Sequence, residues 1–162
     1  MTLVLFRIDE RLLHGQVIVG WGMRLGIDYY VVVDDELATS EWEQDIYSAG
    51  LAEKTPAFFV SAVEAVERFR ELDSRKGRGA LLTRGTAVMK RLAAAGVLVD
   101  RRVNLGGLHA TEGRRRVLTY VHLNPGEEED LKAIHGASAG VTARDLPAGR
   151  ELFIEDLVDV VE

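Results

Sequence analysis

The sequence predicts an α/β fold: a single domain built on an open, mostly parallel, twisted sheet with helices on both faces. Apolar runs of about five residues alternate with stretches in which apolar residues recur every three or four positions, the pattern of βαβ units. The chain has 162 residues, which is the size of one domain. Its hydrophobic share of 47% supplies a core and excludes a disordered chain.

The predicted strands are apolar runs bounded by polar or turn-forming residues. They span residues 3–8, 29–33, 57–60, 79–83, 102–105, 117–123 and 139–143. Between them, segments with helical periodicity predict helices. These span residues 14–25, 40–52, 62–72, 86–95 and 125–135. Residues 151–162 end in an apolar and acidic run, for which a final helix is one option.

The first predicted helix carries an apolar stripe with one member every four residues. The stripe consists of Leu13, Val17, Trp21 and Leu25. A stripe of this kind predicts that the helix packs on the sheet, with Trp21 in the core.

The last predicted helix is marked at both ends. Asn124 is a suitable N-cap, Pro125 occupies the first helical position, and acidic residues follow in the first turn. Gly136 is a suitable stop signal.

Composition excludes several classes of function. The chain has no cysteine, so disulfides, thiolate metal sites and cysteine nucleophiles are excluded. With a net charge of −6, binding of nucleic acid would need a segregated basic face. We interpret the run Arg114-Arg115-Arg116 as a solvated strand end and predict no nucleic-acid partner. No apolar run approaches the roughly 20 residues of a membrane span, and no secretory signal is evident, so we expect a cytoplasmic protein.

In open α/β sheets, functional sites lie beyond the carboxyl ends of the strands. Four unusual segments follow predicted strands, and they share one rim if the strands are parallel. These segments cover residues 7–17, 34–36, 83–86 and 104–109. From the last three segments, candidate rim residues are Asp35, Arg84, Gly106 and Gly107.

The segment after the first strand has the chemistry of a phosphoryl acceptor. His14 opens a helix, where free backbone amides and the positive end of the helix dipole favour a neutral ring beside a bound anion. Such an imidazole can accept a phosphoryl group while the following amides hold its oxygens and Arg7 or Arg11 supplies charge. Asp9 could hold the arginines or orient the ring. The alternative is a structural turn network in which His14 only begins a helix.

Other candidate sites have structural explanations. The acidic segment 34–36 could bind Mg²⁺ as receiver domains do, but we favour a polar rim that orders its loop, and we predict no metal site. The pair Gly106 and Gly107 lacks the third spaced glycine and the following helix of a dinucleotide-binding fingerprint. A close approach of the backbone to the active loop explains the two glycines better. A structural role is also predicted for the remaining histidines, which are His109, His122 and His135.

Residues 7–17, RIDERLLHGQV, resemble the phosphorylation-site motif R-I-D-x-R-L-x-H-G-Q-V. This motif occurs in the IIB components of the mannose/fructose/sorbose family of the bacterial sugar phosphotransferase system (PTS). The family usually also has a tryptophan at the position of Trp21. Residues 32–36 and 104–114 are similar to its V-x-N/D-D-E segment and to N-x-G-G-M/L followed by E-G-K/R. The sequence differs at Arg84 and Gly85, where many members have Asn and Pro.

The resemblance implies that residues 1–162 form one IIB domain with an open α/β sheet. It implies that His14 accepts phosphate from a phosphohistidine of the IIA component and passes it to a sugar held by the membrane components IIC and IID. No cofactor is implied, and a homodimer is one option. The supporting residues are Arg11 and Arg7, which balance charge, Asp9, which orders the loop, and Gly15 and Gln16, whose amides hold the phosphate oxygens.

Two other hypotheses stay open at this point. A regulatory phosphoprotein would use phosphorylation of His14 as a signal without moving sugar. A more distant option is a module that binds a small anion or a nucleotide.

Overall fold

A computed structural model, which describes residues 1–158, contains a seven-stranded sheet in the order β3-β2-β4-β1-β5-β8-β9. All neighbouring pairs are parallel except β8 and β9. The strands are β1 (Leu3–Ile8), β2 (Tyr29–Val33), β3 (Ala57–Val60), β4 (Gly79–Thr83), β5 (Val103–Leu105), β8 (Val141–Ala143) and β9 (Leu152–Phe153). The predicted open, mostly parallel sheet is confirmed.

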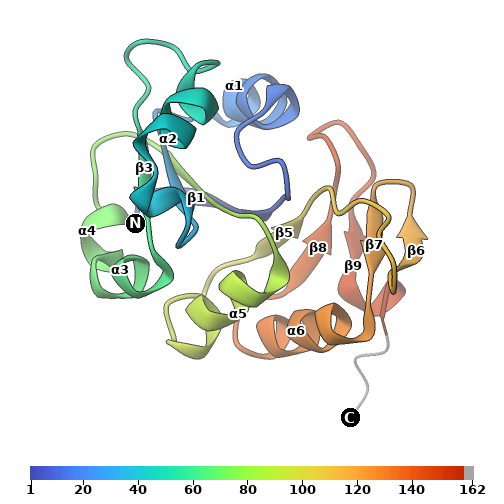
Figure 1. Cartoon of the computed structure of the whole chain (residues 1–162). Coiled ribbons are helices and arrows are strands. Elements are labelled where there is room, and N and C mark those ends of the chain that lie inside the picture. Colours follow the sequence, from blue (N-terminus) through green and yellow to red (C-terminus); the bar gives the residue numbers. More distant parts are fainter. Residues whose placement is uncertain (159–162) are drawn as a thin grey trace.

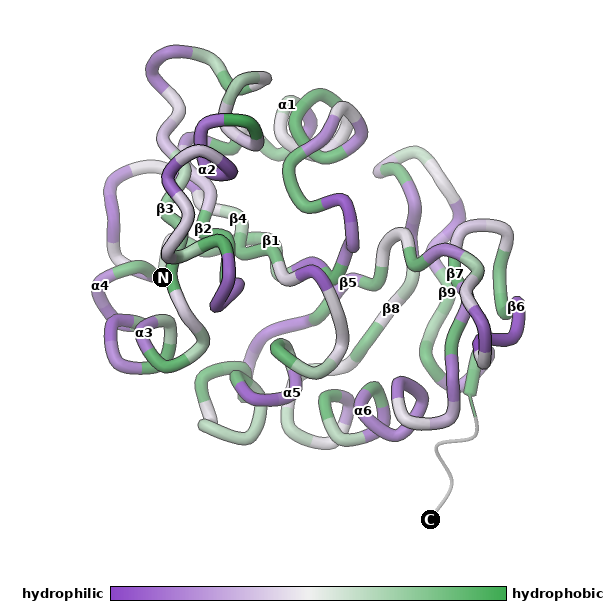
Figure 2. Tube along the Cα trace, in the orientation of Figure 1, coloured by the Kyte–Doolittle hydropathy of each residue, from purple (hydrophilic) through white to green (hydrophobic). Residues whose placement is uncertain are grey.

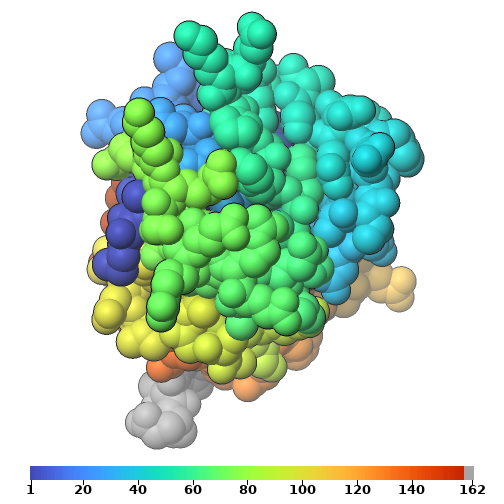
Figure 3. All heavy atoms as spheres, turned by 90° about the vertical axis from the view of Figure 1, so that its left-hand side faces the viewer, coloured from blue at the N-terminus to red at the C-terminus, as the bar shows by residue number. Residues whose placement is uncertain are grey.

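Helices cover both faces of the sheet (Figure 1). One face carries the π-helix η1 (Gln16–Trp21), α1 (Gly22–Leu25), the 3₁₀ turn η2 (Leu37–Thr39) and α2 (Glu41–Ser48). The other carries α3 (Ala62–Glu67), α4 (Phe69–Leu72), α5 (Thr86–Ala94) and α6 (Pro125–Gly136). Figure 3 looks onto α3 and α4, in green, with the cyan segment of α2 beside them.

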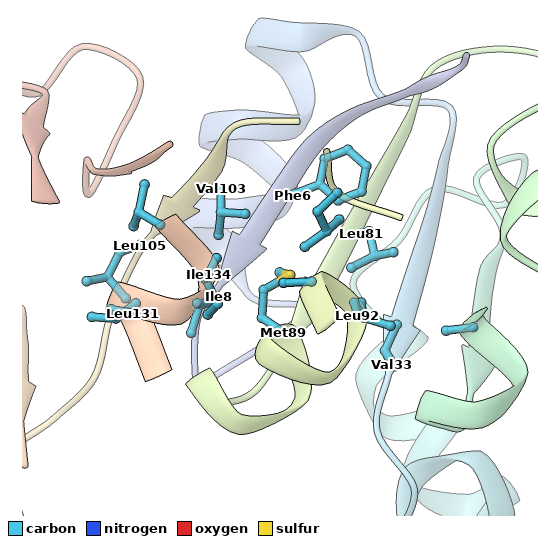
Figure 4. Packing of buried hydrophobic residues seen from close by; sticks show 14 of the residues in the cluster. Phe6, Ile8, Val33, Leu81, Met89, Leu92, Val103, Leu105, Leu131 and Ile134 are labelled. Atoms are coloured by element: carbon cyan, nitrogen blue, oxygen red, sulfur yellow. The ribbon is translucent and has the colours of Figure 1, made fainter. Parts of the chain in front are cut away.

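The core consists of two apolar layers because the central strands are buried on both sides. In β2, Val31 and Val33 belong to the larger layer, while Val32 belongs to the smaller one under α1 and α2. Figure 4 shows the larger layer, where Met89 and Leu92 of α5 face side chains of the sheet. Figure 2 shows the same central strands in hydrophobic green, with hydrophilic segments in the outer loops and helix surfaces.

The capping prediction for α6 is confirmed. The Asn124 side chain accepts from the amide of Glu127 at 2.8 Å, and the Glu127 carboxylate accepts from the amide of Asn124 at 3.0 Å. This reciprocal pair is a capping box, and Pro125 follows it as the first helical residue. The helix continues through Gly136, one residue beyond its predicted end.

The single strand predicted over 117–123 is wrong. The segment folds as an antiparallel hairpin, β6 (Arg115–Leu118) and β7 (Val121–Leu123), outside the main sheet. Its turn at Thr119 and Tyr120 contains no glycine or proline, so the apolar alternation runs through it without a turn signal. Arg114 pairs with Glu127 of α6 at 2.7 Å and is 15% exposed, whereas the side chain of Arg115 is 58% exposed. The predicted solvated strand end therefore does not extend to Arg114.

Three helix predictions need correction. The segment 62–72 is divided into α3 and α4 at Arg68, whose φ of −100° and ψ of 12° leave the helical region. The first helix begins at Gln16 as a π-helix and continues from Gly22 as α1, so the stripe residue Leu13 lies in the loop before it. In the tail, β9 and the 3₁₀ turn η3 (Ile154–Asp156) replace the start of the expected helix, and residues 159–162 lie outside the described residues.

Among residues 1–158, no helix combines the length and the apolar character that crossing a bilayer requires.

The core predicts the outcome of a single truncation. Leu92 of α5 is fully buried between helix and sheet, so Leu92→Ala should lower the free energy of unfolding by about 2–5 kcal/mol. Urea unfolding followed by circular dichroism measures this change. Val99→Ala is the matched control, because Val99 is 61% exposed, and a change within about 0.5 kcal/mol is expected. Equal losses in the two variants would contradict the assigned layer.

Candidate active site

The loop beyond β1 lies where successive crossover connections change from one face of the sheet to the other. β1 sits between β4 and β5, and the chain leaves β1 toward one face of the sheet but leaves β4 toward the other. In doubly wound folds this position opens a crevice for a ligand. Backbone hydrogen bonds tie the loop to both neighbours, from Asp9 N to Thr83 O at 3.0 Å and from Glu10 N to Gly107 O at 3.0 Å. The predicted convergence of these strand ends on one rim is therefore observed.

The loop itself is a tight turn around Asp9. The Asp9 carbonyl accepts from the amide of Leu12, and its Oδ1 accepts from the amide of Arg11 at 3.2 Å. Leu12 has a φ of 55°, in the left-handed region that costs a residue with a side chain of order 1 kcal/mol or more. Its side chain is fully buried, so packing holds this conformation in place.

Asp9 orients the ring of His14. Nε2 of His14 lies 3.2 Å from Oδ2 of Asp9, and the side chain of His14 is 16% exposed. A hydrogen bond to a carboxylate requires the proton on Nε2, so Nδ1 carries the lone pair. The ring is thus fixed in one tautomer with Nδ1 as the nitrogen available for chemistry.

The carboxylate of Asp9 is ionised although it is completely buried. Burial by itself would raise its pKa, but the hydrogen bond with His14 and the charge of Arg7 outweigh burial and lower the pKa below its ordinary value. A buried charge of this kind is stable only when it is paired and hydrogen-bonded.

Arg7 supplies that pairing from beneath the loop. Its guanidinium is 0% exposed and its Nη2 donates to Oδ2 of Asp9 at 3.1 Å. Its terminal nitrogens also donate to the Asn104 side chain and to the carbonyls of Arg144 (2.8 Å) and Asp145 (3.0 Å). The terminal N–H groups of Arg7 are thus committed to protein groups, and the side chain positions Asp9. Its expected part in balancing the charge of the phosphoryl group stays a prediction.

Gly106 and Trp21 make room for this guanidinium. A Cβ atom on Gly106 would lie 2.4 Å from Cζ of Arg7, which is the close backbone approach expected of these glycines. The Arg7 guanidinium lies 5.1 Å from the centre of the Trp21 ring, and the indole N–H donates to the carbonyl of Asp145 at 2.9 Å. Trp21 is a core residue as predicted, and it also supports the site.

The sequence interpretation missed the partners on the far side of Arg7. Asn104 is a polar residue in the buried strand β5, and that combination is a signal that it has a buried partner. The carbonyls of Arg144 and Asp145 give no sequence signal, because any residue type offers a carbonyl.

Arg11 contacts the same carboxylate as Arg7 but from the solvent side, with its Nε 3.7 Å from Oδ1 of Asp9. Its side chain is 51% exposed, and Nη2 donates to Oε1 of Gln16 at 2.7 Å. The first helical hydrogen bonds run from Val17 N and Ile18 N to the carbonyl of His14. The amides of Gly15 and Gln16 therefore precede these bonds, as the predicted phosphate-holding role requires.

A cleft of about 920 Å³ opens beside the loop. Of the predicted site and rim residues, Arg11, Gln16, Arg84 and Gly107 line it. Asp35 does not: its carboxylate caps the amide of Ala62 at 2.9 Å and pairs with Arg91, so its expected place on this rim is corrected.

Two histidines line the same cleft. Glu10 accepts from both the amide and the ring of His109, which joins the active loop to the segment after β5. The ring of His122 contacts the carbonyl of Leu108 at 3.2 Å. The third histidine, His135, lies outside the cleft lining and is held by the amide of Val141.

The acidic segment 34–36 orders its loop. Oδ1 of Asp34 accepts from the amide of Leu37 at 3.0 Å, and Oδ2 pairs with Arg84 at 3.2 Å. Within residues 1–158, no three His, Asp or Glu side chains gather in a way that could hold a metal ion.

Residues 3–161 match the family described as the PTS system sorbose subfamily IIB component. The chain belongs to this family. It is 28% identical to the N-acetylgalactosamine-specific phosphotransferase enzyme IIB component 1 of Escherichia coli K12, over 96% of this chain and 98% of that one. It is also 28% identical to the fructose-specific EIIB component of Bacillus subtilis 168, over 100% and 99%. The crystal structure of manxB from Thermoanaerobacter tengcongensis has a TM-score of 0.85 at 25% identity, covering 97% of this chain and 95% of that one.

This IIB component therefore has a sugar phosphotransferase role, and the predicted family and fold are confirmed. The comparisons give no support to the regulatory phosphoprotein that the sequence left open.

The glycine that accommodates Arg7 gives a stability prediction. Gly106→Ala should force the guanidinium away from Asp9 and lower the free energy of unfolding by about 1–3 kcal/mol, because the added carbon meets a fully packed group. Thermal unfolding measures the change. Gly85→Ala is the control, since nothing lies within 4 Å of its added carbon. A Gly106→Ala variant as stable as Gly85→Ala would show that the Arg7 guanidinium is not tightly packed against Gly106.

The lowered pKa of Asp9 makes part of the stability depend on pH. A carboxyl with a pKa below its ordinary 3.8 stabilises the fold above that pH, and this stabilisation is lost as the pH falls through the pKa of the folded state. Asp9→Asn should lower the free energy of unfolding at pH 7 by about 3–5 kcal/mol, because Arg7 is left as an unpaired buried charge. The deficit relative to wild type should shrink in urea titrations below pH 4. The exposed Asp45→Asn is the control, and a deficit independent of pH would contradict the assignment.

Proposed function

We propose that Nδ1 of His14 accepts a phosphoryl group from a phosphohistidine of a IIA component and passes it to a sugar held by the membrane components IIC and IID. One observation carries this proposal: Nε2 of His14 is held by the buried carboxylate of Asp9. This leaves Nδ1 as the nucleophile. The chain would accordingly act on the cytoplasmic side of the membrane, as a protein-N(pi)-phosphohistidine–sugar phosphotransferase.

In both half-reactions, the bond that forms or breaks on this protein is the bond between Nδ1 and phosphorus. In the first, the lone pair of Nδ1 forms the N–P bond while the N–P bond of the donor breaks and its electron pair returns to the donor ring. In the second, a sugar hydroxyl oxygen attacks the phosphorus, the bond to Nδ1 breaks, and the restored lone pair can take the hydroxyl proton. Such exchanges depend chiefly on in-line positioning and on stabilisation of the charge of the phosphoryl oxygens.

The residues around His14 have separate tasks in this exchange. The exposed guanidinium of Arg11 would contact the phosphoryl oxygens, together with the amides of Gly15 and Gln16. Asp9 would hold the ring throughout the cycle and stabilise positive charge on it. Arg7 would keep Asp9 ionised and in place from below.

The relatives support a monosaccharide as the final acceptor. The two curated relatives named above are equally identical to this chain, and their names specify N-acetylgalactosamine and fructose. Because the IIB domain presents only the phosphoryl group, we propose that the membrane components select the sugar.

Replacement of the acceptor tests the proposal. His14→Ala should abolish labelling by a phosphorylated IIA component while the thermal unfolding midpoint stays close to wild type, because the ring belongs to neither apolar layer of the core. Intact mass spectrometry with peptide mapping measures the label, and excess chelator in the assay tests the prediction that no metal is needed. His135→Gln is the control and should be labelled like wild type. A fully labelled His14→Ala variant would overturn the proposal.

A further inference from the structure

Arg84 stands next to the active loop at the end of the neighbouring strand. The last paired residues of β1 and β4 are Ile8 and Thr83, so Asp9 and Arg84 are the first residues beyond the two adjacent strand ends. The amide of Asp9 donates to the carbonyl of Thr83 at 3.0 Å. The side chain of Arg84 lines the same cleft as Arg11.

Two groups hold the Arg84 guanidinium in one orientation. Nε donates to Oδ2 of Asp34 at 3.2 Å, and Nη1 lies 3.4 Å from the hydroxyl of Tyr47, whose ring centre is 5.9 Å from Cζ. Within residues 1–158, Nη2 has no hydrogen-bond acceptor, and the side chain is 43% exposed. Nε and Nη1 are therefore held by protein groups, while the two N–H groups of Nη2 stay available to donate to an oxyanion.

The charge of the transferred group calls for more than one cation. A phosphoryl group in transfer spreads negative charge over three equatorial oxygens, whereas the terminal N–H groups of the buried Arg7 all donate to protein groups. Arg11 is half-exposed and shares its Nη2 with Gln16. Arg84 is the other arginine that lines the cleft.

We propose that Arg84 is a second phosphoryl-binding arginine of this IIB component, donating from Nη2 to an oxygen of the group that moves to or from His14. This inference rests on the proposed function, since it assumes transfer at His14. Asp34 and Tyr47 then act as positioning residues that set the guanidinium toward the cleft. The bond changes are those given above, and Arg84 neither gains nor loses a proton.

The test uses the full chain with phosphoramidate as a small phosphoryl donor, so that protein docking plays no part. The rate of labelling is followed by intact mass spectrometry, and the label is located by peptide mapping. Arg84→Met should slow labelling of His14 by about tenfold to a hundredfold, the effect of one charge-assisted hydrogen bond. Arg84→Lys should fall between Arg84→Met and wild type, because lysine restores the charge without the planar fork.

Arg91→Met is the matched control. Arg91 is similarly exposed and also paired with an aspartate, Asp35, but it does not line the cleft. The Arg91→Met variant should be labelled at the wild-type rate. An equal loss of labelling rate in both variants would show that only the net charge of the protein matters, and would overturn the inference. If Arg84→Met fails to fold, Arg84→Gln and Arg84→Lys carry the comparison.

The outcomes separate the two proposals. Absence of label on wild-type His14 from both phosphoramidate and phosphorylated IIA would overturn the proposed function itself. A wild-type rate for Arg84→Met with phosphoramidate would overturn the role of Arg84 alone. If that variant were slow only with phosphorylated IIA, Arg84 would contact the partner protein and not the phosphoryl group, which also overturns the inference.

Discussion

The buried ion pair of Arg7 and Asp9 is the interaction on which the site depends. Two charges without solvent are stable only if their remaining donors and acceptors are satisfied. The structure meets this requirement with Asn104 of β5 and with the carbonyls of Arg144 and Asp145. The pair therefore joins β1, β5 and the segment after β8, and through Asp9 it also supports the ring of His14.

The topology explains why this buried pair can lie next to a histidine that is partly exposed. Because β1 is a central strand, its last residues are covered on both faces, and Arg7 is taken out of solvent. Directly after β1, the chain leaves the sheet at the crevice that forms where successive crossover helices lie on opposite faces. The tight loop, with Leu12 in a left-handed conformation, turns the chain back so that His14 reaches the buried carboxylate of Asp9 five residues earlier.

The division of labour between arginines follows from the same geometry. Arg7 and Arg11 are four residues apart, yet one is completely buried and the other is half-exposed. A phosphocarrier needs both kinds: a fixed cation that keeps the orienting carboxylate ionised, and accessible cations that can contact a group in transit between two partners. Arg11 and Arg84 line an open cleft and not an enclosed pocket, which leaves their guanidinium groups accessible from solvent.

The sequence by itself determined six of the seven strands of the sheet, the capped start of α6, and the family motif around His14, since these depend on apolar periodicity and on local residue chemistry. It did not determine the hairpin at 115–123, because alternation continues through a turn that lacks glycine and proline. Nor did it separate the roles of Arg7 and Arg11, which are the same residue type in one motif. Only the tertiary structure decided that distinction. The role of an ionisable side chain depends on its burial and on its hydrogen-bond partners. One partner of Arg7 is the carbonyl of Asp145, more than a hundred residues away, which the local sequence cannot indicate.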